Sequence, residues 1–129
     1  NLLQEMAKNA DLLRELEAEM KAFQKIEADM AEIQKQKKTR NTQKNENEMV
    51  EEELKFLADD AVLYKLVGPA LIKQTKAEVA STVAERLKWV NSEIAASDAE
   101  YKELVKKREE QRGKVIVLQQ AVQASNAKK

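Results

Sequence analysis

Carboxylates are the side chains of this sequence whose type and spacing come nearest to supporting catalysis. They occur in runs such as Glu51-Glu52-Glu53 and Glu109-Glu110, and a catalytic carboxylate needs burial or a charged neighbour to tune its pKa. On so charged a chain these runs are expected to face solvent. The chain has no His and no Cys, and no glycine-rich phosphate loop, so acid–base, thiol and metal chemistry lack their usual groups. We predict that the protein is not an enzyme, with no catalytic, cofactor-binding or metal-binding residues.

The composition indicates long helices rather than a thick globular core. Of the 129 residues, 43% are apolar, 4% aromatic and 36% charged, with two Gly and one Pro to interrupt the chain. Basic and acidic residues number 23 each, so no net field favours nucleic acid or an anionic membrane surface. No apolar run approaches the roughly 18 residues of a membrane span. The absence of Cys fits a reducing compartment, and we expect a cytoplasmic protein without nucleic-acid or membrane partners.

The first predicted helix covers residues 1–57. Its apolar residues are spaced by three and four, as in the buried seam of a coiled coil. One short step, from Phe23 to Ile26, suggests a local phase shift, and residues 34–48 contain no apolar side chain. Of the four methionines, only Met6 is expected to leave the core for a binding role. The predicted seam consists of Leu2, Met6, Leu13, Leu16, Met20, Phe23, Ile26, Met30 and Ile33.

The second predicted helix, residues 76–127, has a cleaner seam. Antiparallel pairing with the first helix then places together residues whose numbers sum to about 134, which matches apolar residues at equal heights. In the polar stretch Arg40 and Lys44 would face Ile94 and Val90, so the pair should be looser, covered by Lys and Arg stems or by a neighbouring subunit. The seam is Val79, Val83, Leu87, Val90, Ile94, Ser97, Tyr101, Leu104, Arg108, Gln111, Val115, Leu118 and Val122.

Between the helices, residues 61–74 carry the pattern of a β-hairpin. Two short β-branched and aromatic runs flank Gly68-Pro69, a pair suited to a tight turn. With Val67 opposite Ala70, both faces of the hairpin are largely apolar. A lone two-stranded hairpin is marginal in water, and the chain has no other predicted strands, so we expect assembly with partner chains.

Surplus apolar residues gather at the opposite end, where the two termini meet. The run Val115-Ile116-Val117-Leu118 has two more apolar side chains than the seam requires, and the pairs at 2–3 and 12–13 show the same excess. Contiguous exposed apolar surface usually marks an interaction site, whereas scattered single Val and Leu residues are ordinary surface. The residues alone leave both interpretations open.

Three stretches in the middle third of the chain stand at a specific spacing. They are Glu46-Asn47 followed by Val50, Glu53 and Leu54, then LYKLVGPALIKQ at 63–74, and then RLKWVNSEI at 86–94. In these stretches the chain resembles the β-type subunits of the prefoldin family. It departs from the family pattern at Arg40 and Lys44, where relatives commonly carry Leu.

The resemblance implies a prefoldin-like helical hairpin and a holding chaperone. Prefoldins are heterohexamers of two α-type and four β-type subunits whose hairpins form a double β-barrel, and whose coiled-coil tips grip unfolded clients without ATP. In eukaryotes they pass actin and tubulin to the cytosolic group II chaperonin. Mapped here, assembly would involve Val62, Leu63, Tyr64, Leu66, Val67, Gly68, Pro69, Leu71 and Ile72. Client contacts would come from Leu2, Leu3, Met6, Leu12, Leu13, Val115, Ile116, Val117, Leu118 and Val122.

Two other classes of protein stay open. A structural or tethering coiled coil would explain the helices but would leave the two-faced apolar hairpin without a role. A helical arm of a larger enzyme would require a catalytic domain that this sequence does not contain. Covalent cross-linking separates these classes, because a chaperone subunit should couple to related hairpin-bearing chains.

Overall fold

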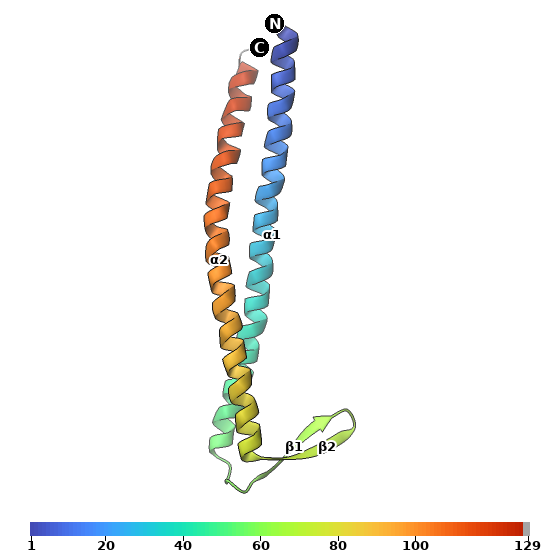
Figure 1. The fold of residues 1–129 in the computed structure, drawn as a ribbon, viewed down its shortest axis with the longest axis vertical. Helices are drawn as coiled ribbons and strands as arrows, with labels where there is room; N and C mark the ends of the chain where they lie inside the picture. The colour runs from blue at the N-terminus through green and yellow to red at the C-terminus, as the bar shows by residue number, and fades with distance from the viewer. Residues whose placement is uncertain (128–129) are drawn as a thin grey trace. The chain divides into compact units, whose positions relative to one another are not determined.

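Two long helices joined by one β-hairpin make up the fold, in a computed structural model that describes residues 1–127. In chain order the elements are α1 (Leu2–Lys55), β1 (Val62–Val67), β2 (Ala70–Thr75) and α2 (Lys76–Ala127) (Figure 1). The predicted mostly-α class with two helices and one hairpin is therefore confirmed. The remaining residues of the predicted single domain, 128–129, lie outside the described range.

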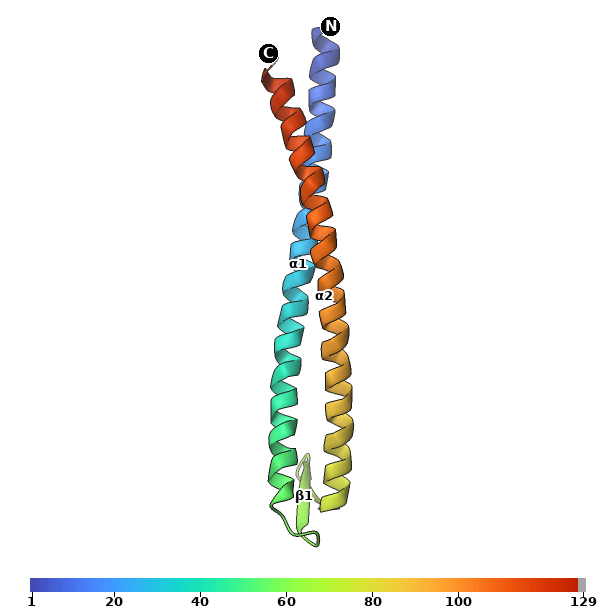
Figure 2. The same ribbon diagram turned by 90° about the vertical axis from the view of Figure 1, so that its left-hand side faces the viewer.

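The chain divides into two compact units, each containing a segment of both helices. The tip unit consists of residues 1–34 and 99–127, and holds both described ends of the chain. The hairpin unit consists of residues 35–98 and includes β1 and β2. Within each unit the α1 and α2 segments lie side by side and run in opposite directions (Figures 1 and 2).

Side chains and tight turns define where the helices begin and end. Asn1 caps α1, because its Oδ1 accepts the Gln4 N–H at 3.0 Å. Thr75 caps α2 in the same way, its hydroxyl accepting the Glu78 N–H at 3.1 Å, which satisfies a donor that has no intrahelical partner. Helix α1 ends at Lys55, two residues before the predicted end. Beyond it the Phe56 and Leu57 N–H groups bond the carbonyls three residues earlier, at 3.2 Å each.

The hairpin has the predicted register at every position, from Val67 opposite Ala70 to Val62 opposite Thr75. Gly68 has φ of 57°, a conformation that side chains disfavour, and the Pro69 ring fixes a negative φ next to it. Positive φ at the first central residue followed by negative φ is the pattern of a type II′ turn, whose twist matches that of the two strands. This turn leaves a single alignment of the strands.

The buried seam of α2 agrees with the prediction along its whole length. Every predicted position from Val79 to Val122 is buried or half-buried. Val83, Val90 and Val122 are the most deeply placed of these residues. The apolar residues of α2 fit a single heptad register, and the structure has that register.

The seam of α1 in the tip unit differs from the prediction. Buried and half-buried positions alternate by three and four without a phase shift. Leu12 and the polar Glu19 take the places that the prediction gave to Leu13 and Met20, and the polar Asn9 is a buried position that the prediction left out. The step from Phe23 to Ile26 is then an ordinary one. The observed seam is Asn9, Leu12, Leu16, Glu19, Phe23, Ile26, Met30 and Ile33, with Leu2, Met6, Leu13 and Met20 exposed beside it.

The polar stretch packs more tightly than expected, and the half-buried residues of α1 agree with the predicted cover by Lys and Arg stems. Val90 is only 2% exposed, although α1 offers no apolar residue between 34 and 48. Long polar side chains of α1 are half-buried along this segment: Lys37, Arg40, Gln43, Lys44 and Asn47. Their aliphatic stems cover the α2 valines while their charged ends reach the rim.

Polar ends at this rim also find partners on α2. The Arg40 guanidinium lies 4.6 Å from the centre of the Trp89 ring, a cation–π distance. Lys37 Nζ lies 2.6 Å from Asp98 Oδ1. Arg40, which departs from the family pattern, is therefore accommodated by its contact with Trp89.

Candidate interaction surfaces

The hairpin exposes apolar side chains on both of its faces. On one face Leu66 is 70% exposed and lies opposite Leu71, which is similarly open. On the other face Val67 and Ile72 are about half exposed. Only Leu63, at the base, is partly covered among the apolar residues predicted for assembly. The structure thus brings the predicted assembly residues together as one uncovered apolar surface.

Both strands of the hairpin also have an open edge. In the described chain the sheet consists of β1 and β2 alone, so each strand pairs on one side and presents a row of N–H and C=O groups on the other. Such edges are templates for pairing with further strands. Exposed apolar faces and unpaired edges together are the physical features of a piece of a larger sheet.

The tip unit exposes six of the ten apolar residues that were predicted to bind clients. Val117, at 64%, is the most open on α2, whereas Val115 and Leu118 are half-buried because they also belong to the seam. Val122 was predicted both for the seam and for client contact, and its 8% exposure fits the seam position and leaves little surface for a client. Leu12 is half-buried, and the exposed members are Leu2, Leu3, Met6, Leu13, Ile116 and Val117.

Sequence reasoning missed one member of the tip surface. Met6, Leu13 and Met20 are seven residues apart and exposed, so they lie on one side of α1. We call these three residues the α1 stripe. Met20 was assigned to the core because apolar residues at 12 and 13 allow two neighbouring seams, and the chosen seam was the wrong one. The heptad spacing of the stripe was the available signal. Among the four methionines, Met30 alone is buried.

Grooves accompany this exposed surface in the tip unit. The largest, of about 570 Å³, lies between Glu15 and Glu19 of α1 and Val117 and Leu118 of α2. Gly113 borders it, and no atom within 4 Å would meet a Cβ there, so this side of the groove is open. A second groove of about 420 Å³ lies near the chain ends, between Leu12 and Ala121. These are shallow, partly apolar clefts rather than an enclosed pocket.

Polar groups interrupt the seam of the tip unit. Gln111 Nε2 donates to the Glu19 carbonyl at 2.8 Å and also to the Glu19 carboxylate. Asn9 is buried, and its Oδ1 has no hydrogen-bond partner among the described residues. A buried amide without a partner destabilises its surroundings, so this unit holds polar residues inside while apolar residues face solvent.

The described residues offer little for reaction chemistry. Within 1–127 no group of His, Cys, Asp or Glu is arranged to hold a metal ion, and neither helix contains a stretch with the length and apolarity that crossing a membrane requires. Among these residues the pKa of Lys55 is raised above the usual 10.5, because its ammonium donates a hydrogen bond to the Glu52 carboxylate and lies beside that negative charge. The surfaces are suited to binding by apolar contact.

Comparisons with known proteins agree with this description. Residues 4–122 match the family model described as prefoldin subunit. The chain is 35% identical to prefoldin subunit 6 of Arabidopsis thaliana, over 92% of each chain. It is 32% identical to that of Mus musculus, over 90% of this chain and 91% of the relative. The prefoldin beta subunit of Thermococcus strain KS-1 has the same fold, with a TM-score of 0.71 at 23% identity, over 78% of this chain and 89% of that one.

Proposed function

The chain belongs to the prefoldin subunit family, and from this premise we propose that it is a β-type arm of a hexamer that holds unfolded proteins without ATP. Prefoldins are a chaperone family rather than an enzyme family, and a member of it assembles with other prefoldin subunits. The finer proposal concerns which surfaces of this chain assemble and which hold a client. It also concerns what that client is.

Assembly is assigned to the hairpin. Its apolar faces, at Leu66, Leu71, Val67 and Ile72, are uncovered, and both strand edges are open. Strands from neighbouring subunits would pair with the edges and bury the faces, which is the economical way to satisfy both. We propose a complex of two α-type and four β-type subunits, joined through such hairpins.

Client holding is assigned to the tip unit, and one observation carries this assignment. Apolar side chains of the α1 stripe and of Val117 face solvent although the seam between the helices is complete without them. Shallow grooves and flexible thioethers adapt to many apolar shapes, unlike a defined pocket. Several such arms acting together would hold a client by avidity, each contact being weak.

The proposed clients are unfolded proteins of the actin and tubulin type, which the cytosolic group II chaperonin would then receive. This proposal follows from membership of the family and fits a cytoplasmic protein without Cys. It requires no cofactor, because capture and release depend on binding alone. A structural or tethering coiled coil remains the competing function.

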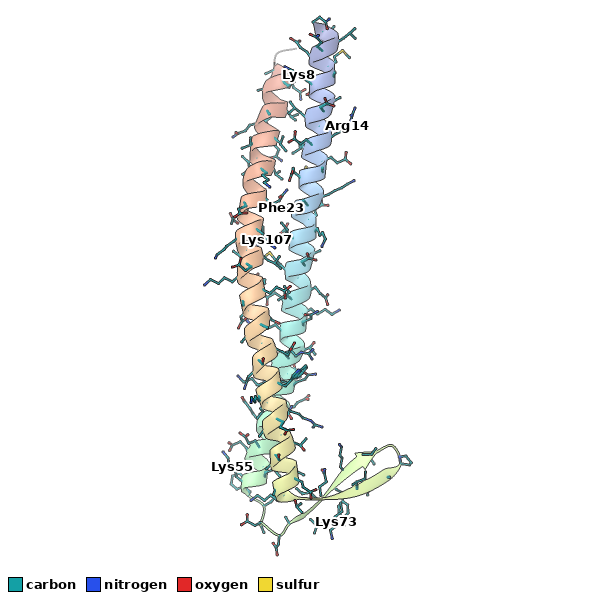
Figure 3. The ribbon with its side chains drawn as sticks, in the orientation of Figure 1. Lys8, Arg14, Phe23, Lys55, Lys73 and Lys107 are labelled. Carbon is teal, nitrogen blue, oxygen red and sulfur yellow. The ribbon has the colours of Figure 1, made fainter. Side chains whose placement is uncertain are left out.

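The test is capture of chemically unfolded actin by the reconstituted hexamer, followed by light scattering on dilution. We expect Met6→Ser, Leu13→Ser and Met20→Ser together to weaken suppression of aggregation several-fold, because the exposed apolar stripe is lost while the seam is kept. The matched control replaces three exposed charged residues of the same segment, Lys8, Arg14 and Lys21, by Ser. Figure 3 labels Lys8 and Arg14 on α1.

The control hexamer should suppress aggregation as well as the unmodified one. Equal suppression by the stripe variant would remove client holding from this surface. Assembly is tested separately by native mass spectrometry with the partner subunits, where Leu66→Asp should prevent the hexamer. A chain that ignores these partners and forms a plain helical dimer would favour the structural coiled coil. Transfer of fluorescent actin from hexamer to chaperonin tests the last step.

A further inference from the structure

A second apolar surface lies at the end of α1, apart from the hairpin strands and the tip. Phe56 is 87% exposed, and Met49 is also open to solvent. Met49 lies in the last turns of α1, and Phe56 is the first residue after the helix. Val50 and Leu57 are partly exposed nearby. We call Met49, Val50, Phe56 and Leu57 the α1-end surface. A phenyl ring this open is unusual and indicates a missing partner.

Phe56 lies in a turn that hydrogen bonds and an ion pair hold in place, rather than in a loose loop. Lys76, at the start of α2, donates from Nζ to the Leu57 carbonyl at 2.9 Å and pairs with Asp59 at 3.3 Å. The Phe56 N–H bonds the Glu53 carbonyl, and the Ala61 N–H bonds the Ala58 carbonyl at 3.0 Å. These bonds therefore hold the backbone of the turn that carries Phe56.

The α1-end surface is continuous with the hairpin through a groove. A cleft of about 300 Å³ lies between the end of α1, the base of the hairpin and the start of α2. Val50 and Leu57 line it from α1, and Leu63 and Tyr64 line it from β1. These four residues form the apolar part of a groove that joins the base of the hairpin to the end of α1, beside polar residues such as Glu53 and Lys65.

Charge separates this end of the chain into an acidic and a basic part. Residues 46–60 contain seven carboxylates and one lysine. Glu51, Glu52 and Glu53 stand near the carboxyl end of α1, where the helix dipole disfavours negative charge. The strands instead expose Lys65 and Lys73 (Lys73 is labelled in Figure 3). A hairpin of this kind is therefore complementary in charge, as well as apolar in its faces, to the α1-end surface.

We propose that the α1-end surface binds the hairpin of the neighbouring prefoldin subunit, so that the subunit interface extends beyond strand pairing onto helix α1. Phe56 is the apolar anchor of this contact, and the surrounding carboxylates face basic residues of the neighbour. The inference rests on the proposed function of the hairpin in assembly and adds a second contact on a different element.

The test is a dilution series of the reconstituted hexamer, followed by native mass spectrometry. Because Phe56 is almost fully exposed, Phe56→Glu leaves the fold of the subunit unchanged, which circular dichroism checks. We expect the concentration at which the hexamer dissociates to rise at least about tenfold, as for loss of an aromatic anchor. The matched control, Val117→Glu, places the same charge at an exposed apolar position of the tip and leaves assembly unchanged.

A photo-cross-linking amino acid at position 56 supplies a positive readout. Cross-links to a hairpin peptide of a neighbouring subunit support the inference, whereas cross-links confined to a captured client overturn it. If Leu66→Asp prevents the hexamer while Phe56→Glu assembles at the unmodified concentration, the inference fails and the proposed function stands. If Leu66→Asp also assembles normally, both are overturned.

Discussion

The two units of this chain place their polar and apolar residues in opposite ways. In the hairpin unit, α1 is polar over residues 34–48, and yet Val90 is more deeply buried than any other core residue in the described chain. In the tip unit, α1 is rich in apolar residues, and yet Asn9 and Gln111 are inside while Leu13 and Met20 face solvent.

The difference shows that the composition of one helix does not predict how well a helix pair is packed. Long Arg and Lys side chains supply enough methylene surface to cover a valine, so a polar helix can form half of a dry seam. Apolar residues outside the seam contribute nothing to that packing and are free to bind another molecule. The helix pair of the hairpin unit therefore buries its apolar residues efficiently, while the helix pair of the tip unit leaves apolar residues exposed.

A substitution at Val90 is the most direct test of this contrast between the two units. We expect Val90→Ala to destabilise the hairpin unit by roughly 2 to 3 kcal/mol, because it leaves a cavity in the buried seam. Ile116→Asp, at an exposed apolar position of the tip, should change stability by less than about 0.5 kcal/mol. The chain has a single Trp, Trp89, which can be labelled as 5-fluorotryptophan. Fluorine NMR of this label then follows the unfolding of the hairpin unit in urea, within the reconstituted hexamer. Equal effects of the two substitutions would contradict the contrast.

Replacing Asn9, the buried polar residue of α1 in the tip unit, is expected to stabilise that unit rather than destabilise it. Asn9→Leu should stabilise the tip unit by about 1 kcal/mol, since it replaces an amide whose oxygen has no partner with a side chain that fits an apolar seam. Slower amide hydrogen exchange in residues 2–20 would show the gain. Lys8→Leu, one residue earlier and exposed, adds the same side chain outside the seam and should not slow exchange.

The contact between Arg40 and Trp89 sharpens the account of the polar stretch. Arg40→Ala should destabilise the hairpin unit by about 0.5 to 1 kcal/mol through loss of the cation–π contact and of stem coverage. A double-mutant cycle with Trp89→Leu measures the coupling between the two side chains. Zero coupling would mean that Arg40 only covers apolar surface of α2 with its aliphatic stem. Thr39→Ala, on the exposed side of α1, serves as the control.

The smallest expected effect concerns the pKa of Lys55 at the acidic end of α1. The Glu52 carboxylate accepts its hydrogen bond at 2.7 Å and, together with the charge of Glu51, raises this pKa above 10.5. The contribution of the pair to stability is therefore complete below the unfolded pKa and is lost as pH rises through the raised one. Glu52→Gln should return the NMR-titrated pKa of Lys55 toward 10.5, whereas Glu48→Gln should not.

Much of the fold follows from the sequence because local rules leave few choices. Gly68-Pro69 allows one turn type, and the turn sets all the strand pairs. The α2 seam offers a single heptad stripe, so its burial could be predicted from Val79 to Val122. The uncovered apolar hairpin could be predicted from the same local features, and nothing else in the described residues covers its two faces.

The remaining features depend on the partner helix, which a pattern within one helix does not contain. Either Leu12 or Leu13 could belong to the buried seam of α1. The observed seam contains Leu12 and Glu19, and Glu19 accepts a hydrogen bond from Gln111 of α2. Phe56 was assigned to the first helix with no role, because its exposure arises from a turn held by Lys76 from the start of α2. Val122 was assigned both to the seam and to client contact, because seam and surplus apolar residues are interleaved there, and only its seam position agrees with its burial.

The two open edges of the hairpin have a consequence for how cells must produce this chain. Newly made copies without partners would expose pairing edges and apolar faces at once, and the same edges that join related subunits also join identical ones into aggregates. Balanced synthesis of the partner chains, or rapid degradation of the unassembled excess, is then a condition for keeping the protein in use. A cell that overproduces this chain alone is expected to accumulate it as aggregate, and co-expression of its partners should restore it.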